Sequence, residues 1–281
     1  MVYLLSAIVL ATLIGHIFKL RDRLGSSTYA ILLVNYIVAI GISAVQVRNM
    51  DFGPRPLGAV SLAVSLGLLF VLCYALMNLT IRKLGVSISV SLTRLSAVLP
   101  TLGSILLFGE QVKLLQAPGL LLAFVVLPLS AHELPSRSNL RRLLHGGLGW
   151  GMLLFVAMGV NDFIFKVKGE LFRGVDYSTF LLVVYLVAFV FCLFEVLRRR
   201  ISISRGGVLL GTALGVVNYA TAASIMAAME VLPGMFAYPI NGVGVILLSS
   251  VTSLFLWREK LRSHNYVFIV GAVIAIWLIN L

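Results

Sequence analysis

Charged residues are scarce in this sequence. Only 11% of the 281 residues are Asp, Glu, Lys or Arg, whereas 60% are hydrophobic and the mean hydropathy is +1.06. A soluble domain carries about a quarter charged residues. Because so little charge cannot cover a water-facing surface, a soluble globular domain is excluded, and we expect most of the surface to face lipid.

The sequence also lacks the motifs of several enzyme classes. It has no GxxxxGK[ST] phosphate loop, which argues against direct use of ATP, and no HExxH or GxSxG motif. The two cysteines, Cys73 and Cys192, lie inside apolar runs and indicate small core residues rather than a disulfide framework or a metal site. We therefore expect no enzyme activity, no metal and no cofactor.

The net charge of +12 does not indicate a nucleic-acid partner, because Lys and Arg form short clusters between apolar runs, as in membrane loops. The apolar runs are long enough to span a membrane, for which a helix needs about 20 residues. The first run has neither a basic n-region nor a small-residue cleavage site, so we interpret it as a retained span rather than a signal peptide. We expect an all-α, multi-pass protein with ten membrane-spanning helices at residues 1–20, 28–46, 58–80, 86–108, 115–131, 147–166, 178–197, 207–228, 234–256 and 264–281.

The chain contains an internal repeat. The segment that begins at Gly85 aligns without a gap with the segment that begins at Gly234, an offset of 149 residues, and shorter matches occur in the first two spans. We predict a five-helix repeat at 1–131, a connector at 132–146 and a second repeat at 147–281. Because five crossings leave the chain on the opposite side of the membrane, the second repeat must be inverted. Many secondary transporters have this arrangement, with the substrate site near the membrane midplane.

Arg94 is the ninth residue of the fourth expected span, where a charge is costly. It could anchor an anionic substrate group or form a gating ion pair. Alternatively, carbonyls and hydroxyls of a neighbouring helix could satisfy it. Arg94 shares a helical stripe with Ser87, Ser91 and Thr101, which favours a wet or protein-facing side, although close packing of small residues also explains the stripe.

Asn161 and Asp162 lie near the far end of the sixth expected span. Asp162 could bind a cation, accept a transported proton or pair with Arg94, and proton coupling is a hypothesis on this basis. The fourth and sixth spans run in the same direction, which separates Asp162 and Arg94 in depth by roughly 13 Å and argues against a direct pair. A local ion pair with Lys166 is the structural alternative for Asp162.

Other polar side chains lie inside expected spans that the repeat relates to one another. Each can hydrogen-bond a ligand or a neighbouring helix. Tyr36 and Tyr185 recur in both halves, which favours a structural role for this pair. The candidates for substrate binding are Asn218, Tyr219, Tyr238 and Asn241, with His16, Tyr74 and Asn78 as weaker candidates.

Two prolines and two glutamates occupy the repeated segment. Pro100 and Pro239 interrupt the fourth and ninth spans, where each bends its helix and could provide either a moving element or a static kink. Glu110 and Glu259 are related by the repeat and lie at helix ends, so we expect both to cap helices at the membrane interface.

These features resemble the ten-helix, EamA-type members of the drug/metabolite transporter superfamily. The resemblance rests on the first span ending in IFKL, its echo IFKV in the sixth span, the FGEQ and WREK steps, and the duplication. It implies a secondary transporter, often an exporter of amino acids, metabolites or toxic organics. It implies a cavity lined by spans one, three, four, six, eight and nine. The chain departs from the first-span signature with Trp and Asn that many relatives have, because Leu13, Ile14 and Gly15 stand there.

We therefore expect a transporter in the inner (plasma) membrane that exports a small organic solute by alternating access. The expected partners are a small-molecule substrate, the lipid bilayer and, as a hypothesis, a coupling proton, and a homodimer is left open. A non-transporting receptor or scaffold subunit and a membrane-embedded enzyme are the alternatives. Connectors after the odd-numbered spans hold 15 of the 22 Lys and Arg residues, which predicts both termini outside. The family resemblance instead implies termini in the cytoplasm.

Overall fold

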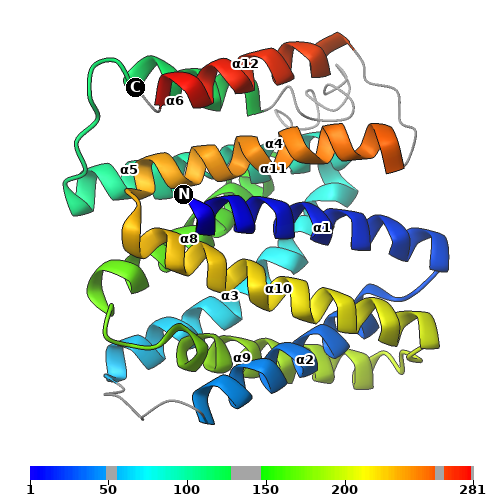
Figure 1. The fold of residues 1–281 in the computed structure, drawn as a ribbon. Coiled ribbons are helices and arrows are strands. Elements are labelled where there is room, and N and C mark those ends of the chain that lie inside the picture. The colour runs from blue at the N-terminus through cyan, green and yellow to red at the C-terminus, as the bar shows by residue number, and fades with distance from the viewer. Residues whose placement is uncertain (49–55, 128–146, 257–262, 280–281) are drawn as a thin grey trace. The chain divides into compact units, whose positions relative to one another are not determined.

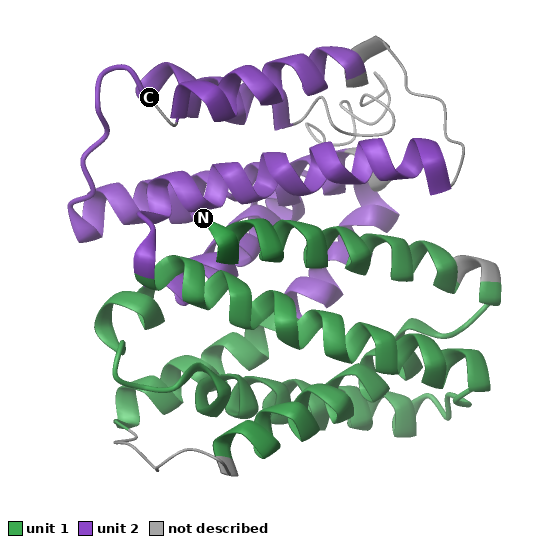
Figure 2. Cartoon of the chain, in the orientation of Figure 1, with its two compact units in different colours: residues 1–71, 167–230 green, residues 72–166, 231–281 purple. Residues whose placement is uncertain are grey.

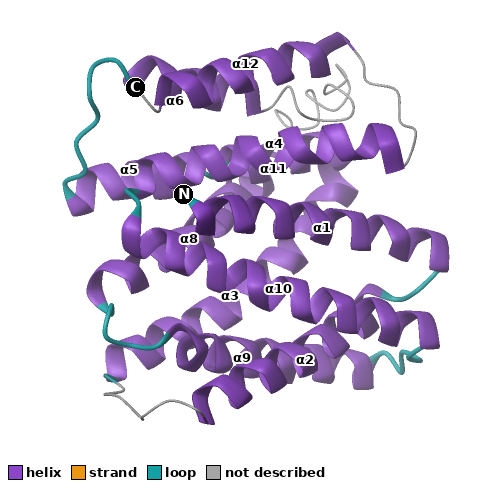
Figure 3. Ribbon diagram, viewed as in Figure 1, coloured by secondary structure: helices purple, strands orange, loops and turns teal. Residues whose placement is uncertain are grey.

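A computed structural model of the protein describes residues 1–48, 56–127, 147–256 and 263–279 (Figure 1). Within these ranges the regular structure is helical, without strands (Figure 3). The helices are α1 (Val2–Leu24), α2 (Thr28–Arg48), α3 (Leu57–Leu84), α4 (Val86–Leu95), α5 (Val98–Phe108), α6 (Ala117–Val126), α8 (Leu148–Leu171), α9 (Tyr177–Arg198), α10 (Arg205–Val231), α11 (Gly234–Leu256) and α12 (Ser263–Ile279).

Eight segments of the described chain are long and apolar enough to cross a membrane, which indicates a multi-pass membrane protein. In such segments a helix satisfies every backbone polar group internally, as the lipid interior requires. The eight correspond to the expected spans one to four and six to nine. The expected fifth and tenth spans contain shorter apolar helices, Ala117–Val126 and Tyr266–Ile279. Large apolar side chains such as Leu106 and Phe255 are 76% and 79% exposed, as expected for lipid-facing positions.

The expected fourth span is two helices rather than one. α4 and α5 are separated by a turn at Ser96 and Ala97, which ends three residues before Pro100. The N–H of Leu99 donates to the carbonyl of Ser96 at 3.0 Å, a bond that Pro100 cannot make because it has no N–H. The predicted interruption at Pro100 is therefore confirmed. Pro239, by contrast, lies inside α11, which continues as one helix through the position where an interruption was expected.

The described chain divides into two compact units, with boundaries inside α3 and α8 (Figure 2). Each unit contains residues from both the first and the second half of the sequence. The expected connector at 132–146 lies outside the described residues. Unit 1 comprises residues 1–71 and 167–230, and unit 2 comprises residues 72–166 and 231–281.

In unit 1, α2 packs against α9 in an antiparallel direction. Gln46 near the end of α2 meets Ser178 near the start of α9, and the midpoints meet at Tyr36 and Tyr185. α10 runs parallel to α2 and approaches it closely. A Cβ atom on Gly215 would lie only 2.8 Å from the carbonyl oxygen of the α2 residue Asn35. Small residues are what allow membrane helices to pack at such short distances.

In unit 2, α6 and α12 form an antiparallel pair. Gly119 near the start of α6 lies against Leu278 near the end of α12, and Val126 near the end of α6 lies against Gly271. α11 packs on α5, α6 and α12. α8 runs parallel to α5, because Gly159 lies against Leu99 and Phe163 against Gly103. It runs antiparallel to α11, where the Tyr238 hydroxyl bonds the carbonyl of Asp162.

Candidate functional site

Seven of the ten predicted site residues lie in unit 2, and Asp162 on α8 is at the centre of their contacts. The amide Nδ2 of Asn161 donates to Oδ1 of Asp162 at 3.2 Å. The hydroxyl of Tyr238, which is buried on α11, donates to the backbone carbonyl of Asp162 at 3.0 Å. The structure therefore brings Asn161, Asp162 and Tyr238 together across the contact between α8 and α11.

Arg94 lies in the last turn of α4, just before the break at Ser96, and its guanidinium is attracted by the carboxylate of Asp162. Among the described residues no direct ion pair joins these two side chains, in agreement with their expected difference in depth. The register between the helices explains the offset. Gly159 of α8 lies against Leu99 of α5. Arg94 is five residues before Leu99, whereas Asp162 is three residues after Gly159, so the two side chains lie at different depths along the helices. The two opposite charges thus attract each other from two helices without a direct bond. We call the residues Arg94, Asn161, Asp162 and Tyr238 the polar cluster of unit 2.

Five side chains in unit 2 have a buried polar atom without a hydrogen-bond partner within the described part of the chain, and three of these atoms lie on the helices that carry Arg94, Asp162 and Tyr238. These three are Oδ1 of Asn161, Oδ1 of Asn241 and Oγ of Ser91. Asn241 lies three residues beyond Tyr238 on α11, and Ser91 lies three residues before Arg94 on α4, so each shares a helix face with a member of the cluster. Buried polar atoms are nearly always satisfied by protein, water or ligand. These atoms therefore leave hydrogen-bonding capacity for a bound molecule.

The cluster can recognise both charge types. Arg94 offers a planar guanidinium that suits a carboxylate or phosphate. Asp162 and the two orphaned amide oxygens are acceptors, which suit an ammonium, a hydroxyl or a proton. Two weaker candidates, Tyr74 and Asn78, lie one turn apart on α3, where Nδ2 of Asn78 donates to the carbonyl of Tyr74 at 2.8 Å. This bond occupies one donor of Asn78 within its own helix.

Lys166 makes a different contact from the local pair with Asp162 that the sequence allowed. Its Nζ atom lies 2.7 Å from Oε1 of Glu110. Glu110 also accepts hydrogen bonds from the N–H groups of Gly234 and Met235, which confirms that it caps a helix, here α11. Glu259, the residue related to Glu110 by the repeat, lies outside the described residues.

The sequence interpretation missed the burial of two lysines on α8. It ended the sixth span at residue 166 and assigned the KVKGELFRG segment to a connector. In the structure α8 continues to Leu171, Lys166 is 2% exposed, and Lys168 is 1% exposed. Lys168 pairs with Glu230 of the same unit at 3.0 Å. The available signal was the absence of proline and of a turn sequence between Lys166 and Lys168, which lets the helix continue.

The remaining candidates, Asn218, Tyr219 and His16, lie in unit 1. Nδ2 of Asn218 donates to Oδ1 of Asn35 at 3.2 Å, which joins α10 to α2. The hydroxyl of Tyr219 donates to Oε1 of Gln46 at 2.7 Å and lies 2.9 Å from Oγ of Ser178. Asn218 and Tyr219 therefore bond neighbouring helices, the alternative that the sequence left open for them. His16 is half-buried on α1.

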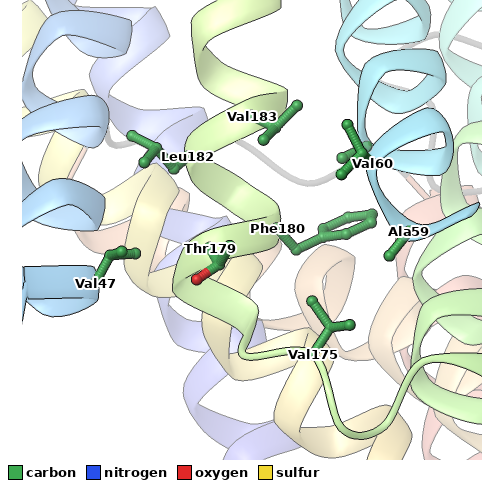
Figure 4. A pocket seen from close by; sticks show the side chains of 9 residues that line it. Val47, Ala59, Val60, Val175, Thr179, Phe180, Leu182 and Val183 are labelled. Carbon is green, nitrogen blue, oxygen red and sulfur yellow. The ribbon is translucent and has the colours of Figure 1, made fainter. Parts of the chain in front are cut away.

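Unit 1 also contains a pocket of about 260 Å³ between the end of α2, the start of α3 and the start of α9. Its lining is apolar apart from the hydroxyl of Thr179, and the ring of Phe180 points toward Ala59 and Val60 (Figure 4). None of the predicted site residues lines this pocket. It offers no charged group, so we place the candidate site at the polar cluster of unit 2.

Comparison with known proteins supports the fold. No protein-family model matches the chain. An uncharacterized protein of Haemophilus influenzae is 24% identical over 216 residues, which are 76% of this chain and 73% of that protein. The crystal structure of another protein, with 14% sequence identity, has a TM-score of 0.78 and covers 100% of this chain and 97% of its own. The chain is thus similar in fold to a solved protein, and this similarity concerns the fold alone.

Proposed function

We propose that the protein is a secondary-active transporter of the EamA type that exports a small organic solute across the inner membrane by alternating access. The observation that carries the proposal is the polar cluster of unit 2. Ionisable residues inside membrane-spanning helices are costly and mark substrate or ion pathways. Here Arg94 and Asp162 attract each other without a direct bond, and buried acceptors beside them have no partner.

In the proposed mechanism, Arg94 binds an anionic group of the solute through paired hydrogen bonds. Asp162 and the amide of Asn161 bind a donor group of the solute or a coupling proton. A solute that bridges the two side chains would satisfy the orphaned acceptors and bring both charges into direct contact with a partner. The solute would then bind most tightly in the conformation that lets Arg94 and Asp162 contact it together. A difference in affinity between two conformations is what allows a solute to drive the change between them.

The helix pairing supports an inverted duplication with ten spans. α2 begins at Thr28 and α9 begins at Tyr177, which is 149 residues later, the offset of the sequence repeat. These two helices lie side by side and antiparallel, as expected for inverted copies. α6 and α12 form a second antiparallel pair at nearly the same offset. We propose α6 and α12 as the fifth and tenth spans, which cross the membrane with their flanking residues.

A thermal-shift screen of the purified chain against small organic metabolites tests the proposal. A ligand that binds the folded protein at 100 times its Kd stabilises it by about 2.7 kcal/mol and so raises the melting temperature. We expect Arg94→Ala to abolish this shift. Arg198→Ala serves as the control, because Arg198 is half-exposed at the end of α9 and pairs with Glu195 in unit 1.

Uptake of the same ligand into vesicles that contain only the purified chain separates the alternatives. Transport would exclude a receptor or scaffold subunit, and recovery of the solute without chemical change would exclude an enzyme. Binding without any transport would instead favour the receptor. Intact binding and transport in Arg94→Ala would show that the site lies elsewhere.

A further inference from the structure

One carboxylate joins three segments of unit 2. Glu110 follows α5, and its Oε1 atom lies 2.7 Å from Nζ of Lys166 in the last third of α8 and accepts the N–H of Gly234 at 2.8 Å. Its Oε2 atom accepts the N–H of Met235 at 2.7 Å. Lys166 is 2% exposed and Glu110 is 11% exposed, so the whole contact is withdrawn from water. The ammonium and the positive end of the α11 dipole therefore both act on the same carboxylate.

The surroundings of Gly234 are shaped around this contact. A Cβ atom at position 234 would overlap Oγ of Ser104 and would lie 3.2 Å from Cδ of Lys166. Glycine is thus required for the start of α11 to approach α5 and α8 so closely. The hydroxyl of Ser104 is buried here and lacks a hydrogen-bond partner within the described residues. A buried polar group therefore remains unsatisfied beside the carboxylate, which is rare in a permanent core.

The contact is adjacent to the candidate site on the same two helices. Lys166 lies four residues beyond Asp162 on α8, and Gly234 lies four residues before Tyr238 on α11. The pair Asp162 and Tyr238 and the pair Lys166 and Gly234 are therefore successive levels, one turn apart, of the antiparallel interface between α8 and α11. Separation of α8 from α11 at this level must break the contacts of Glu110 with one of the two helices.

The chemistry of the contact suits reversible separation. A buried ion pair adds little net stability compared with apolar side chains of the same volume, because the loss of hydration offsets the attraction. Once the helix ends separate, water can hydrate both charges, whereas separated apolar side chains would be exposed at a cost. A Lys–Glu pair is therefore a poor choice for permanent packing and a good choice for a contact that opens.

We infer that Glu110 is a latch that closes the candidate site at this end of α8 and α11, and that its release from Lys166 and Gly234 opens a path to Asn161 and Asp162. In a transporter the latch would act as a gate of the candidate site, and this role rests on the proposed transport function. The latch itself is a property of the structure that can be measured without a substrate.

Cysteine labelling tests the latch. Asn161→Cys is introduced into a background with Cys73 and Cys192 replaced by alanine, and its reaction rate with a neutral maleimide is measured on purified protein in detergent. We expect Glu110→Gln and Lys166→Met to raise the rate about tenfold, the factor that corresponds to a weakening of about 1.4 kcal/mol. The matched control is Lys168→Met, which removes an equally buried lysine from its ion pair with Glu230 in unit 1. We expect this control to label at the parent rate.

The outcomes are distinct. Faster labelling in Glu110→Gln and Lys166→Met but not in Lys168→Met supports the latch. An unchanged rate in both variants, or an equal increase in all three, overturns it. If both variants fail to fold while Lys168→Met folds, the contact is a permanent part of the fold and the inference is also overturned. A chain that transports nothing but shows the selective increase keeps the latch and rejects the transporter, so the two proposals fail separately.

Discussion

Tyr36 and Tyr185 are 149 positions apart in the sequence, and their rings pack against each other with centroids 6.1 Å apart. They occupy equivalent positions in the repeated second-span segment and meet at the middle of the contact between α2 and α9. Tyr185 also packs against Phe70 and Tyr219, with centroids 6.5 Å away in each case. The structural role expected for this pair from its recurrence is therefore confirmed, and the cluster forms an aromatic core of unit 1.

The hydroxyl groups of this core predict that replacing tyrosine by phenylalanine changes the stability differently at positions 185 and 219. The Tyr185 hydroxyl is buried and has no hydrogen-bond partner among the described residues, whereas the Tyr219 hydroxyl bonds Gln46 and lies beside Ser178. Tyr185→Phe should leave the melting temperature unchanged or raise it. Tyr219→Phe should lower the free energy of unfolding by about 0.5–1.5 kcal/mol, because it removes one of the two hydrogen bonds that Oε1 of Gln46 accepts, the other coming from Ser178. Thermal unfolding in detergent measures both, and equal losses would contradict the assigned contacts.

The close approach of α10 to α2 predicts a difference between two glycines. A Cβ atom on Gly215 would lie 2.7 Å from Cβ of Val38, whereas Gly41 on α2 has nothing within 4 Å of such an atom. Gly215→Ala should destabilise the protein by about 1–3 kcal/mol through overpacking. Gly41→Ala should be neutral or stabilising by up to about 1 kcal/mol, because alanine favours the helix. The melting temperatures of the two variants compare the effects directly, and a loss in Gly41→Ala would refute the open environment.

The two buried lysine pairs should respond differently to charge reversal. Lys168 and Glu230 contact each other through side chains, so the double variant Lys168→Glu/Glu230→Lys should regain most of the stability that each single variant loses. The double variant Lys166→Glu/Glu110→Lys should not recover. A lysine at position 110 cannot accept the N–H groups of Gly234 and Met235 and would place a cation at a helix N-terminus.

Folded yield after purification and the melting temperature measure this difference. Each double variant is compared with its own two single variants, so that coupling is separated from the cost of each substitution. Recovery of the Lys166→Glu/Glu110→Lys variant would show that capping of α11 by Glu110 contributes little to stability.

The proton hypothesis for Asp162 makes a prediction about the driving force. Asp162→Asn removes the titratable group but keeps an acceptor oxygen beside Asn161. Transport driven by a pH gradient across vesicles should be abolished, while exchange of labelled for unlabelled solute at equal pH should persist. Asp162→Glu is the control, because it retains a carboxylate at this position. If pH-driven transport in Asp162→Asn keeps the dependence of the parent protein, Asp162 does not carry the proton.

The apolar runs predict the helices well because the lipid interior allows little else for such sequences. Eight of the ten expected spans contain helical segments of spanning length in the described residues, the fourth as two short helices in succession. The position of Pro100 also predicts the break in the fourth span, since the missing N–H acts locally. Pro239 does not break α11, because its ring removes a single helical bond near the start of the helix while the surrounding contacts of α11 are retained.

Partner choice within the candidate site could not be predicted from the sequence. Lys166 and Lys168 looked like interfacial charges because hydropathy describes one residue at a time. Their burial depends on Glu110 and Glu230, the second of which is 62 residues away from its lysine. Similarly, Asn218 and Tyr219 had suitable side chains at a suitable depth, but their hydrogen bonds with Asn35 and Gln46 depend on how α10 packs against α2. Tertiary contacts decide these roles.

The composition of the two units has a consequence for biosynthesis. Unit 1 needs α9 and α10 from the second half of the chain, so α2 leaves the ribosome long before its packing partner exists. Between Arg48 and Tyr177 the ribosome must add 129 residues, which takes on the order of ten seconds at about 5–20 residues per second. Through that interval the fully buried face of α2, with Ile31, Asn35 and Ala39, must be sheltered by lipid, by the insertion machinery or by other nascent helices. Maturation of the first half of the chain is therefore limited by the synthesis of the second.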